Sequence, residues 1–170
     1  MNFKKNLVFL GMMGSGKSSI GYLVSKKLNL KFIDIDNIIE KQTAMKIIDI
    51  FEKKGEKFFR SLEEKITLKI LKVEFGIISL GGGGFVNDKI RKEILNNHLS
   101  FWLNWDLETL LKRIKNSKKR PLAYNSTDQE IRNLIKKRSL IYSKAKFKIN
   151  CNKLTKNEIV KKIQKIYEAN

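Results

Sequence analysis

The chain has 170 residues, which is typical of one domain, and its 42% hydrophobic and 31% charged residues indicate a folded protein instead of a disordered segment. The formal net charge of +19 comes mainly from lysines scattered along the chain, which argues against a dedicated nucleic-acid-binding surface. No apolar run approaches the roughly 20 residues of a membrane span, and the single cysteine, Cys151, has no internal disulfide partner, so we expect a cytoplasmic protein without membrane association.

Apolar runs and helical periodicity alternate along the chain. Short apolar runs predict five buried strands, at residues 7–11, 31–36, 76–81, 99–104 and 147–150. Longer segments with apolar residues at helical spacing predict helices, among them 17–29, 55–73, 106–115, 128–143 and 156–167. This alternation predicts an α/β fold, a three-layer αβα domain around a five-stranded parallel sheet. Ligands bind at the carboxyl ends of the strands in such sheets, so the residues that follow each strand are the candidates for a site.

Residues 11–18, GMMGSGKS, follow the first predicted strand and open the first predicted helix. They match the phosphate-binding pattern G-x-x-x-x-G-K-[ST]. Its glycines let backbone N–H groups face a polyphosphate, and the helix N-terminus adds a positive potential. We expect Lys17 to reach the β and γ phosphates of a nucleotide and Ser18 to ligate Mg²⁺. The pattern predicts nucleotide binding, but it does not separate a switch or a motor from a small-molecule kinase.

Two carboxylates and a glycine run follow the next two strands. Asp34 and Asp36 in FIDIDN are expected on one face of the second strand. There they can hold a Mg²⁺-bound water and accept a proton from a sugar-like hydroxyl group; a helix cap leading into NIIEKQ is the alternative. Four glycines at 81–84 follow the third strand. A tight turn needs only one or two, so the run indicates close approach of the backbone to a ligand.

Arginine is rare in this lysine-rich chain, which makes its positions informative. Arg60 and Arg138 are candidates for bidentate binding of a carboxylate or phosphate group. Arg113 and Arg120 are further candidates, and Arg120 belongs to the polar segment NSKKRPLAYNSTD, which holds the only proline and lies between two predicted helices, as a mobile lid would. Each arginine alone is more often a surface charge, so they indicate a site only as a set.

The ordered set of motifs resembles the shikimate kinase family. The matching segments extend over almost the whole chain: GMMGSGKSSIG, DIDNIIE, IIDIFEKKGEKFFRSLEE, ISLGGGG, KRPL and KRSLIY. The resemblance implies a single domain over 1–170 with a P-loop, nucleoside monophosphate kinase-like fold, a shikimate-binding segment at about 34–62 and the lid at about 113–126. It implies transfer of the γ-phosphate of ATP to the 3-hydroxyl of shikimate, on the pathway to chorismate and the aromatic amino acids.

The resemblance also implies roles for individual residues. Lys17, Asp36 and Arg120 are the implied catalytic residues, with Asp36 bonded to the shikimate hydroxyls and acting as base. The implied ATP site comprises Gly14, Ser15, Gly16, Lys17, Ser18, Ser19, Arg113, packed on adenine, and Arg120, which reaches the transferring phosphate. The implied shikimate site comprises Asp36, Phe51, Phe59, Arg60, Gly82, Gly83 and Arg138. Mg²⁺ is the implied cofactor, held by Ser18 and, through water, by Asp34, and we expect a monomer.

This chain departs from the family pattern at two places outside the reacting centre. Thr43-Ala44 stands where many relatives have Thr-Gly, which concerns a turn. The segment NCNKLTKN near the last strand lacks a proline that some relatives carry, so adenine contacts at 152–154 are left open.

Two other functions are compatible with the sequence. A small kinase for gluconate or a nucleoside monophosphate stays open, as does a basic, ATP-gated nucleic-acid-binding protein.

We expect His98 to be an exposed residue in a connecting segment and Cys151 to be a packing residue. Trp102 and Trp105 flank the fourth predicted strand, and we expect core or strand-end positions for them instead of a stacking platform.

Overall fold

Five parallel strands form the centre of the fold. The computed structural model describes residues 5–116 and 126–170. The strands are β1 (Leu7–Leu10), β2 (Phe32–Asp34), β3 (Ile77–Ser79), β4 (Leu99–Asn104) and β5 (Phe147–Asn150). They pair in the order β2-β3-β1-β4-β5, and every pairing is parallel. The predicted five-stranded parallel sheet is confirmed. Strands β3 and β2 lie on one side of the central strand β1, and β4 and β5 lie on the other.

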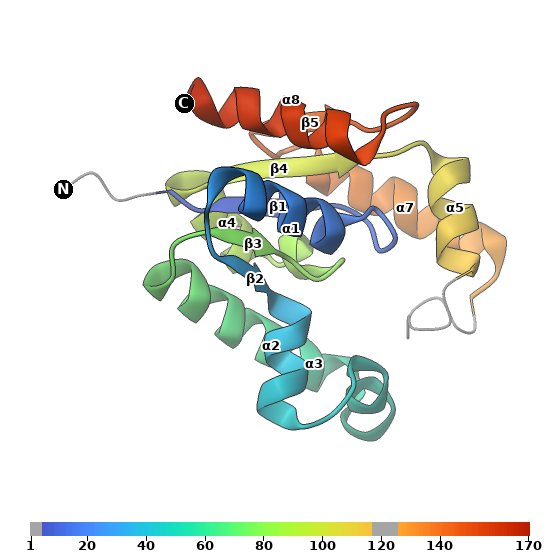
Figure 1. Cartoon of the computed structure of the whole chain (residues 1–170). Coiled ribbons are helices and arrows are strands. Elements are labelled where there is room, and N and C mark those ends of the chain that lie inside the picture. The colour runs from blue at the N-terminus through green and yellow to red at the C-terminus, as the bar shows by residue number, and fades with distance from the viewer. Residues whose placement is uncertain (1–4, 117–125) are drawn as a thin grey trace.

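Helices cover both faces of the sheet (Figure 1). They are α1 (Lys17–Leu28), α2 (Ile35–Thr43), α3 (Ile47–Val73), α4 (Asp88–Asn97), α5 (Leu107–Lys115), α7 (Asp128–Tyr142) and α8 (Lys156–Glu168), with a 3₁₀ turn η1 (Gly84–Val86). Along β1, Leu7 and Phe9 join the cluster that contains α1 and α8, while Val8 and Leu10 join the cluster with α3, α4 and α7. Alternate side chains point to opposite faces of a strand, so the sheet separates two apolar layers. The three-layer architecture is confirmed.

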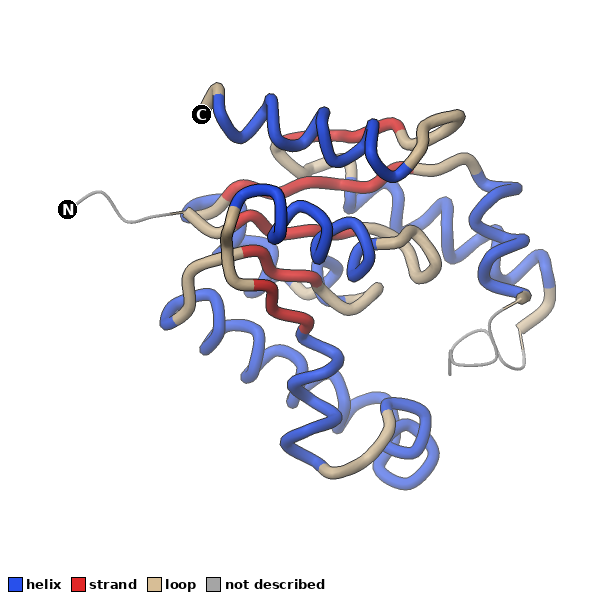
Figure 2. Tube along the Cα trace, in the orientation of Figure 1, coloured by secondary structure: helices blue, strands red, loops and turns tan. Residues whose placement is uncertain are grey.

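Helix α2 and the first part of α3 project from the β2 edge of the sheet (Figure 2). Gly55 has φ 82 and ψ 163 inside α3, and this non-helical residue divides it into two segments. The helix predicted at 55–73 is therefore right for the second segment, and α2 confirms the alternative in which a helix cap leads into NIIEKQ. The projecting part corresponds to the segment at 34–62 that was predicted to bind the acceptor.

The second strand is shorter than predicted, which changes the setting of its two carboxylates. The strand ends at Asp34, and this residue caps α2 because its Oδ1 accepts a hydrogen bond of 3.2 Å from the N–H of Asn37. A short polar side chain at this position stabilises the helix start by satisfying an N–H group that has no partner in the helix. Asp36 therefore lies in the first turn of α2, and the predicted strand face shared with Asp34 is wrong.

The expected exposure of His98 is also wrong. Its side chain is 8% exposed, and its Nδ1 accepts a hydrogen bond of 3.3 Å from the N–H of Asn6. Burial lowers the pKa of His98, and the nearby Glu93 opposes this effect only in part. Cys151 is fully buried, as its packing role required, and burial raises the pKa of its thiol to about 12.

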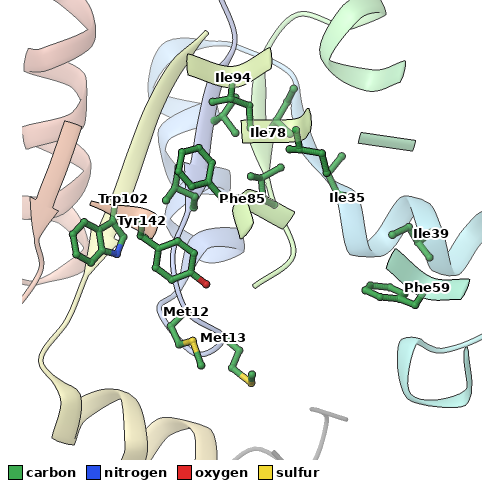
Figure 3. Packing of buried hydrophobic residues seen from close by; sticks show 14 of the residues in the cluster. Met12, Met13, Ile35, Ile39, Phe59, Ile78, Phe85, Ile94, Trp102 and Tyr142 are labelled. Carbon is green, nitrogen blue, oxygen red and sulfur yellow. The ribbon is translucent and has the colours of Figure 1, made fainter. Parts of the chain in front are cut away.

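One apolar cluster connects the sheet to the projecting helices. Figure 3 shows Ile78, Phe85 and Ile94 in its central part and Ile39 of α2 close to Phe59 of α3. Burial of these side chains holds the projecting helices to the β2 edge of the sheet. Across residues 5–116 and 126–170, no helix combines the length and the apolar character that crossing a bilayer requires.

Replacing Ala44 with glycine is expected to stabilise the protein. Ala44 ends α2 with φ 53 and ψ 26, a left-handed conformation in which its Cβ is strained. Glycine removes that strain, so we expect the free energy of unfolding to rise by about 0.5–1 kcal/mol. Thermal unfolding measures the gain. The control is Ala169→Gly, at the C-cap of α8, where φ is −92 and no gain is expected. An equal effect of both substitutions would contradict the argument.

Candidate active site

The loop at residues 11–18 surrounds the N-terminus of α1. Gly14 and Gly16 have φ 80 and 86, so both positions favour glycine. The side chain of Lys17 turns back over the loop, where its Nζ donates hydrogen bonds of 3.0 Å to the carbonyl oxygens of Gly11 and Met12. Lys17 is 8% exposed. The loop thus presents a buried cation beside a helix N-terminus, an arrangement suited to a polyphosphate.

Two oxygen-bearing side chains meet next to this loop. The Oγ of Ser18 donates a hydrogen bond of 2.5 Å to Oδ2 of Asp34, and it lies 3.4 Å from the Oγ of Ser79 on β3. Mg²⁺ prefers oxygen ligands and is usually held by one or two protein groups together with waters and phosphates. The pair of Ser18 and Asp34 therefore fits this ion, and Asp34 serves both as a helix cap and as a candidate for the metal site.

The glycine run after β3 makes room for two carboxylates. A Cβ atom on Gly81 would lie 2.6 Å from Oδ1 of Asp36 and 2.6 Å from Oε1 of Glu63. No other residue type leaves this space. Asp36 comes from α2 and Glu63 from α3, so the loop approaches both projecting helices. Close approach of this run to a ligand stays a prediction, and in the structure the backbone passes unusually close to these two side chains.

Arg60 on α3 lies beside the same loop. Its Nη1 donates a hydrogen bond of 2.7 Å to Oε2 of Glu63, whose side chain is 2% exposed. Its Nε and Nη2 donate to Glu56 at 3.2 Å. Burial acts to lower the pKa of Arg60, but the charges and hydrogen bonds of Glu63 and Glu56 outweigh it and raise this pKa. The guanidinium group is therefore held in a fixed orientation with its charge retained.

Aromatic rings enclose the Arg60 guanidinium. Phe51 and Phe59 have ring centroids 4.7 Å apart, and the Cζ of Arg60 lies 5.8 Å and 5.1 Å from them. A cation over aromatic faces is held at modest energy, and the rings form an apolar wall. A Cβ on Gly83 would meet this guanidinium group, with Cζ only 2.8 Å away. Arg60, the two rings and the glycine loop thus form one continuous surface.

Arg138 and Tyr142 reach the glycine loop from α7, on the other side. Nη1 of Arg138 donates a hydrogen bond of 3.3 Å to the carbonyl oxygen of Gly82, and the hydroxyl of Tyr142 donates to the same oxygen. Burial raises the pKa of Tyr142 to about 12, with Arg138 and Arg60 opposing the shift, so the hydroxyl stays protonated and acts as a donor near neutral pH. Arg60 and Arg138 therefore flank two consecutive glycines.

A cavity of about 450 Å³ adjoins the phosphate-binding loop. Its lining residues come from the loop, from the segment after β4 and from the C-terminal part of the chain: Gly14, Ser15, Gly16, Ser19, Ile20, Trp105, Arg113, Asn116, Leu154, Lys156 and Ile159. The Cζ of Arg113 lies 3.8 Å from the centre of a Trp105 ring, and Nη1 donates weakly to the carbonyl of Gly14 at 3.4 Å. The size and position of the cavity suit the base and sugar of a nucleotide.

The structure brings most of the predicted residues together at the carboxyl ends of the strands. Of the residues predicted for the ATP site, Gly14, Ser15, Gly16, Ser19 and Arg113 line the cavity, and Lys17 and Ser18 lie in the first turn of α1 between them. The residues predicted for the acceptor site gather around the glycine run: Asp36, Phe51, Phe59, Arg60, Gly82, Gly83 and Arg138. Arg120, with most of the lid predicted at 113–126, lies outside the described residues, and 113–115 belong to α5.

Three residues of the site were missing from the sequence prediction. Glu63 and Tyr142 stand in the matched segments SLEE and KRSLIY, but nothing in their spacing indicated contact with the glycine loop. Trp102 is in the core and Trp105 directly follows β4, as expected, but the contact of Trp105 with Arg113 was not predicted. A tryptophan directly after a parallel strand was the available signal, because strand ends border ligand sites.

Comparisons with known proteins agree with this geometry. The family model described as shikimate kinase matches residues 13–168. The shikimate kinase of Sulfurihydrogenibium sp. is 42% identical over 159 residues, which cover 94% of this chain and 95% of that protein. The structure of a shikimate kinase from Acinetobacter baumannii in complex with shikimate has a TM-score of 0.91 at 28% identity, covering 98% of this chain and 94% of the other. That of Aquifex aeolicus has a TM-score of 0.85 at 37% identity, covering 96% of each chain.

Proposed function

The chain belongs to the shikimate kinase family, and from this premise we propose that it phosphorylates the 3-hydroxyl of shikimate with ATP, giving shikimate 3-phosphate and ADP. The observation that carries the assignment is the pair Arg60 and Arg138, which approach the glycine loop from α3 and α7. Two guanidinium groups around one loop suit a small carboxylate. The similar protein from A. baumannii has shikimate bound, which supports the same acceptor here.

The proposed substrate site combines a carboxylate clamp with a hydroxyl-binding end. Arg60 and Arg138 bind the shikimate carboxylate, and Phe51 and Phe59 form its apolar wall. Asp36, beside Gly81, accepts hydrogen bonds from the ring hydroxyls. The remaining contacts come from Gly82 and Gly83, whose lack of side chains lets the backbone reach the ligand.

The reaction is an in-line transfer of one phosphoryl group. The 3-hydroxyl oxygen attacks the γ phosphorus, the bond from this phosphorus to the bridging oxygen of ADP breaks, and the hydroxyl proton passes to the Asp36 carboxylate. Lys17 holds the β and γ phosphates from the loop at 11–18, and Arg120 is proposed to reach the transferring group from the polar segment. These cations offset the negative charge of the phosphates while the phosphoryl group passes from the bridging oxygen of ADP to the 3-hydroxyl oxygen of shikimate.

Mg²⁺ is part of the proposal. Ser18 would ligate the ion and Asp34 would hold one of its waters, which the 2.5 Å contact between these two side chains supports. The ion would neutralise charge on the β and γ phosphates. We also propose that the protein is cytoplasmic and monomeric, with no nucleic-acid partner.

A coupled assay of ADP release tests the function. Shikimate, gluconate and nucleoside monophosphates are compared as acceptors with ATP and Mg²⁺, and only shikimate is expected to accelerate ADP release. Absence of shikimate-dependent turnover by folded protein would refute the assignment. Acceleration by gluconate or a monophosphate alone would instead identify another small kinase.

Arg138→Lys is expected to weaken shikimate binding selectively. Lysine keeps the charge but loses the planar pair of donors, so the KM for shikimate should rise roughly 10- to 100-fold while the KM for ATP changes little. Steady-state kinetics with each substrate varied in turn measures this difference. Arg132→Lys is the matched control, because Arg132 is on the same helix and pairs with Glu108 at the surface. Equal increases in both KM values would contradict the carboxylate clamp.

A further inference from the structure

Trp105 connects two parts of the nucleotide cavity that are distant in the sequence. Its indole ring lies against Arg113, with 3.8 Å from the guanidinium carbon to the ring centre. A guanidinium group is planar and has two faces, and such a short separation places one of them on the indole. The opposite face is then the one available to a planar ligand. Both residues line the cavity of about 450 Å³ beside the phosphate-binding loop.

A hydrogen bond fixes the indole itself. Nε1 of Trp105 donates at 2.9 Å to the carbonyl oxygen of Ser15, a residue 90 positions earlier in the chain. The tryptophan is half-buried, whereas Arg113 is exposed. An exposed arginine on a helix would otherwise sample many side-chain conformations, at an entropic cost when a ligand orders it. The fixed indole reduces this freedom before the ligand arrives.

We propose that Trp105 is a positioning residue for the nucleotide base: it holds the Arg113 guanidinium flat so that the free face of this group stacks on the purine of ATP. This inference rests on the proposed ATP-dependent function. Pre-orientation raises affinity by lowering the ordering cost of binding, without adding a contact of its own to the ligand. Trp105 therefore affects recognition of the base, while the loop and Lys17 bind the phosphates.

The first test measures nucleotide affinity calorimetrically in the absence of shikimate. Trp105→Leu removes the aromatic face, and we expect the Kd for ATP to rise about tenfold. Trp105→Phe keeps a ring but lacks the Nε1 donor that bonds Ser15, so its Kd for ATP is expected to lie between those of Trp105→Leu and the original protein. The matched control is Trp102→Phe, which changes the buried tryptophan inside β4 and should leave the Kd for ATP unchanged. Circular dichroism and thermal unfolding confirm that the variants are folded.

The second test uses tripolyphosphate, which has the phosphates of ATP but no base. Trp105→Leu should change its Kd by less than about twofold. In the Arg113→Ala background, Trp105→Leu should cause little further loss of ATP affinity, because its effect passes through Arg113. Equal weakening of tripolyphosphate and ATP, additive losses in the double variant, or unchanged ATP affinity in Trp105→Leu would each overturn the inference. Failure of the original protein to bind ATP would instead refute the proposed function.

Discussion

Replacement of Asp36 with asparagine is expected to lower kcat by about 10²- to 10⁴-fold, the range attributed to a positioned general base. Asparagine has nearly the same shape, so it still fits beside Gly81, where a Cβ atom would lie 2.6 Å from the carboxylate oxygen. It cannot accept the proton of the attacking hydroxyl. Because the phosphate-binding loop is untouched, the KM for ATP should change little. Rapid-quench measurement of the first turnover separates this chemical step from product release.

A control for stability accompanies this variant. Asp36 is an acidic residue in the first turn of a helix, and its negative charge there contributes to stability. Asp88→Asn removes an acidic residue from the first turn of α4. The two variants should show comparable small changes in thermal stability, and only Asp36→Asn should lose activity. A kcat within about tenfold of the original would show that Asp36 binds the hydroxyl without acting as the base.

Replacement of Arg120 with alanine is expected to reduce kcat by about 10³- to 10⁵-fold, as for arginine residues that contact a transferring phosphoryl group. The expectation derives from the motif KRPL, since Arg120 lies outside the described residues. The affinity for ATP should change little, because in the proposed mechanism Lys17 and the loop at 11–18 hold the ground-state phosphates. Calorimetry with ATP and single-turnover kinetics with shikimate measure the two effects separately.

The neighbouring lysine provides the matched control for Arg120. Lys119→Ala removes one positive charge from the same segment, so it tests whether general electrostatic attraction of ATP explains the loss. We expect a small effect from Lys119→Ala, and an intermediate one from Arg120→Lys, which keeps the charge but not the fork of donors. Similar losses in the two alanine variants would remove Arg120 from the proposed mechanism.

Local patterns in the sequence were sufficient for most of the fold. The strands are short, mostly apolar runs and the longer helices have apolar residues at spacings near 3.6, and both patterns depend only on neighbours along the chain. Asp36 was predicted on a strand but lies in the first turn of α2, and the cause of this error is also local. FIDIDN continues the strand pattern by alternating apolar and polar residues, but Asp34 caps a helix and ends the strand two residues before the predicted end. Capping competes with strand extension at such residues, and hydrophobic periodicity does not detect this competition.

The sequence by itself determined the phosphate-binding loop, because its glycines, lysine and serine are consecutive and their chemistry requires only that spacing. The sequence also indicated that the rare arginines, taken as a set, belong to a binding site. Only the tertiary structure decided how these residues meet: Arg60 and Arg138 flank the glycine loop, with Glu63 and Tyr142 beside them. The role of Trp105 likewise required the pairing of β1 with β4, which places Ser15 within reach of its indole. Contacts of this kind depend on strand order and helix packing, which bring distant residues together and leave no period in the sequence.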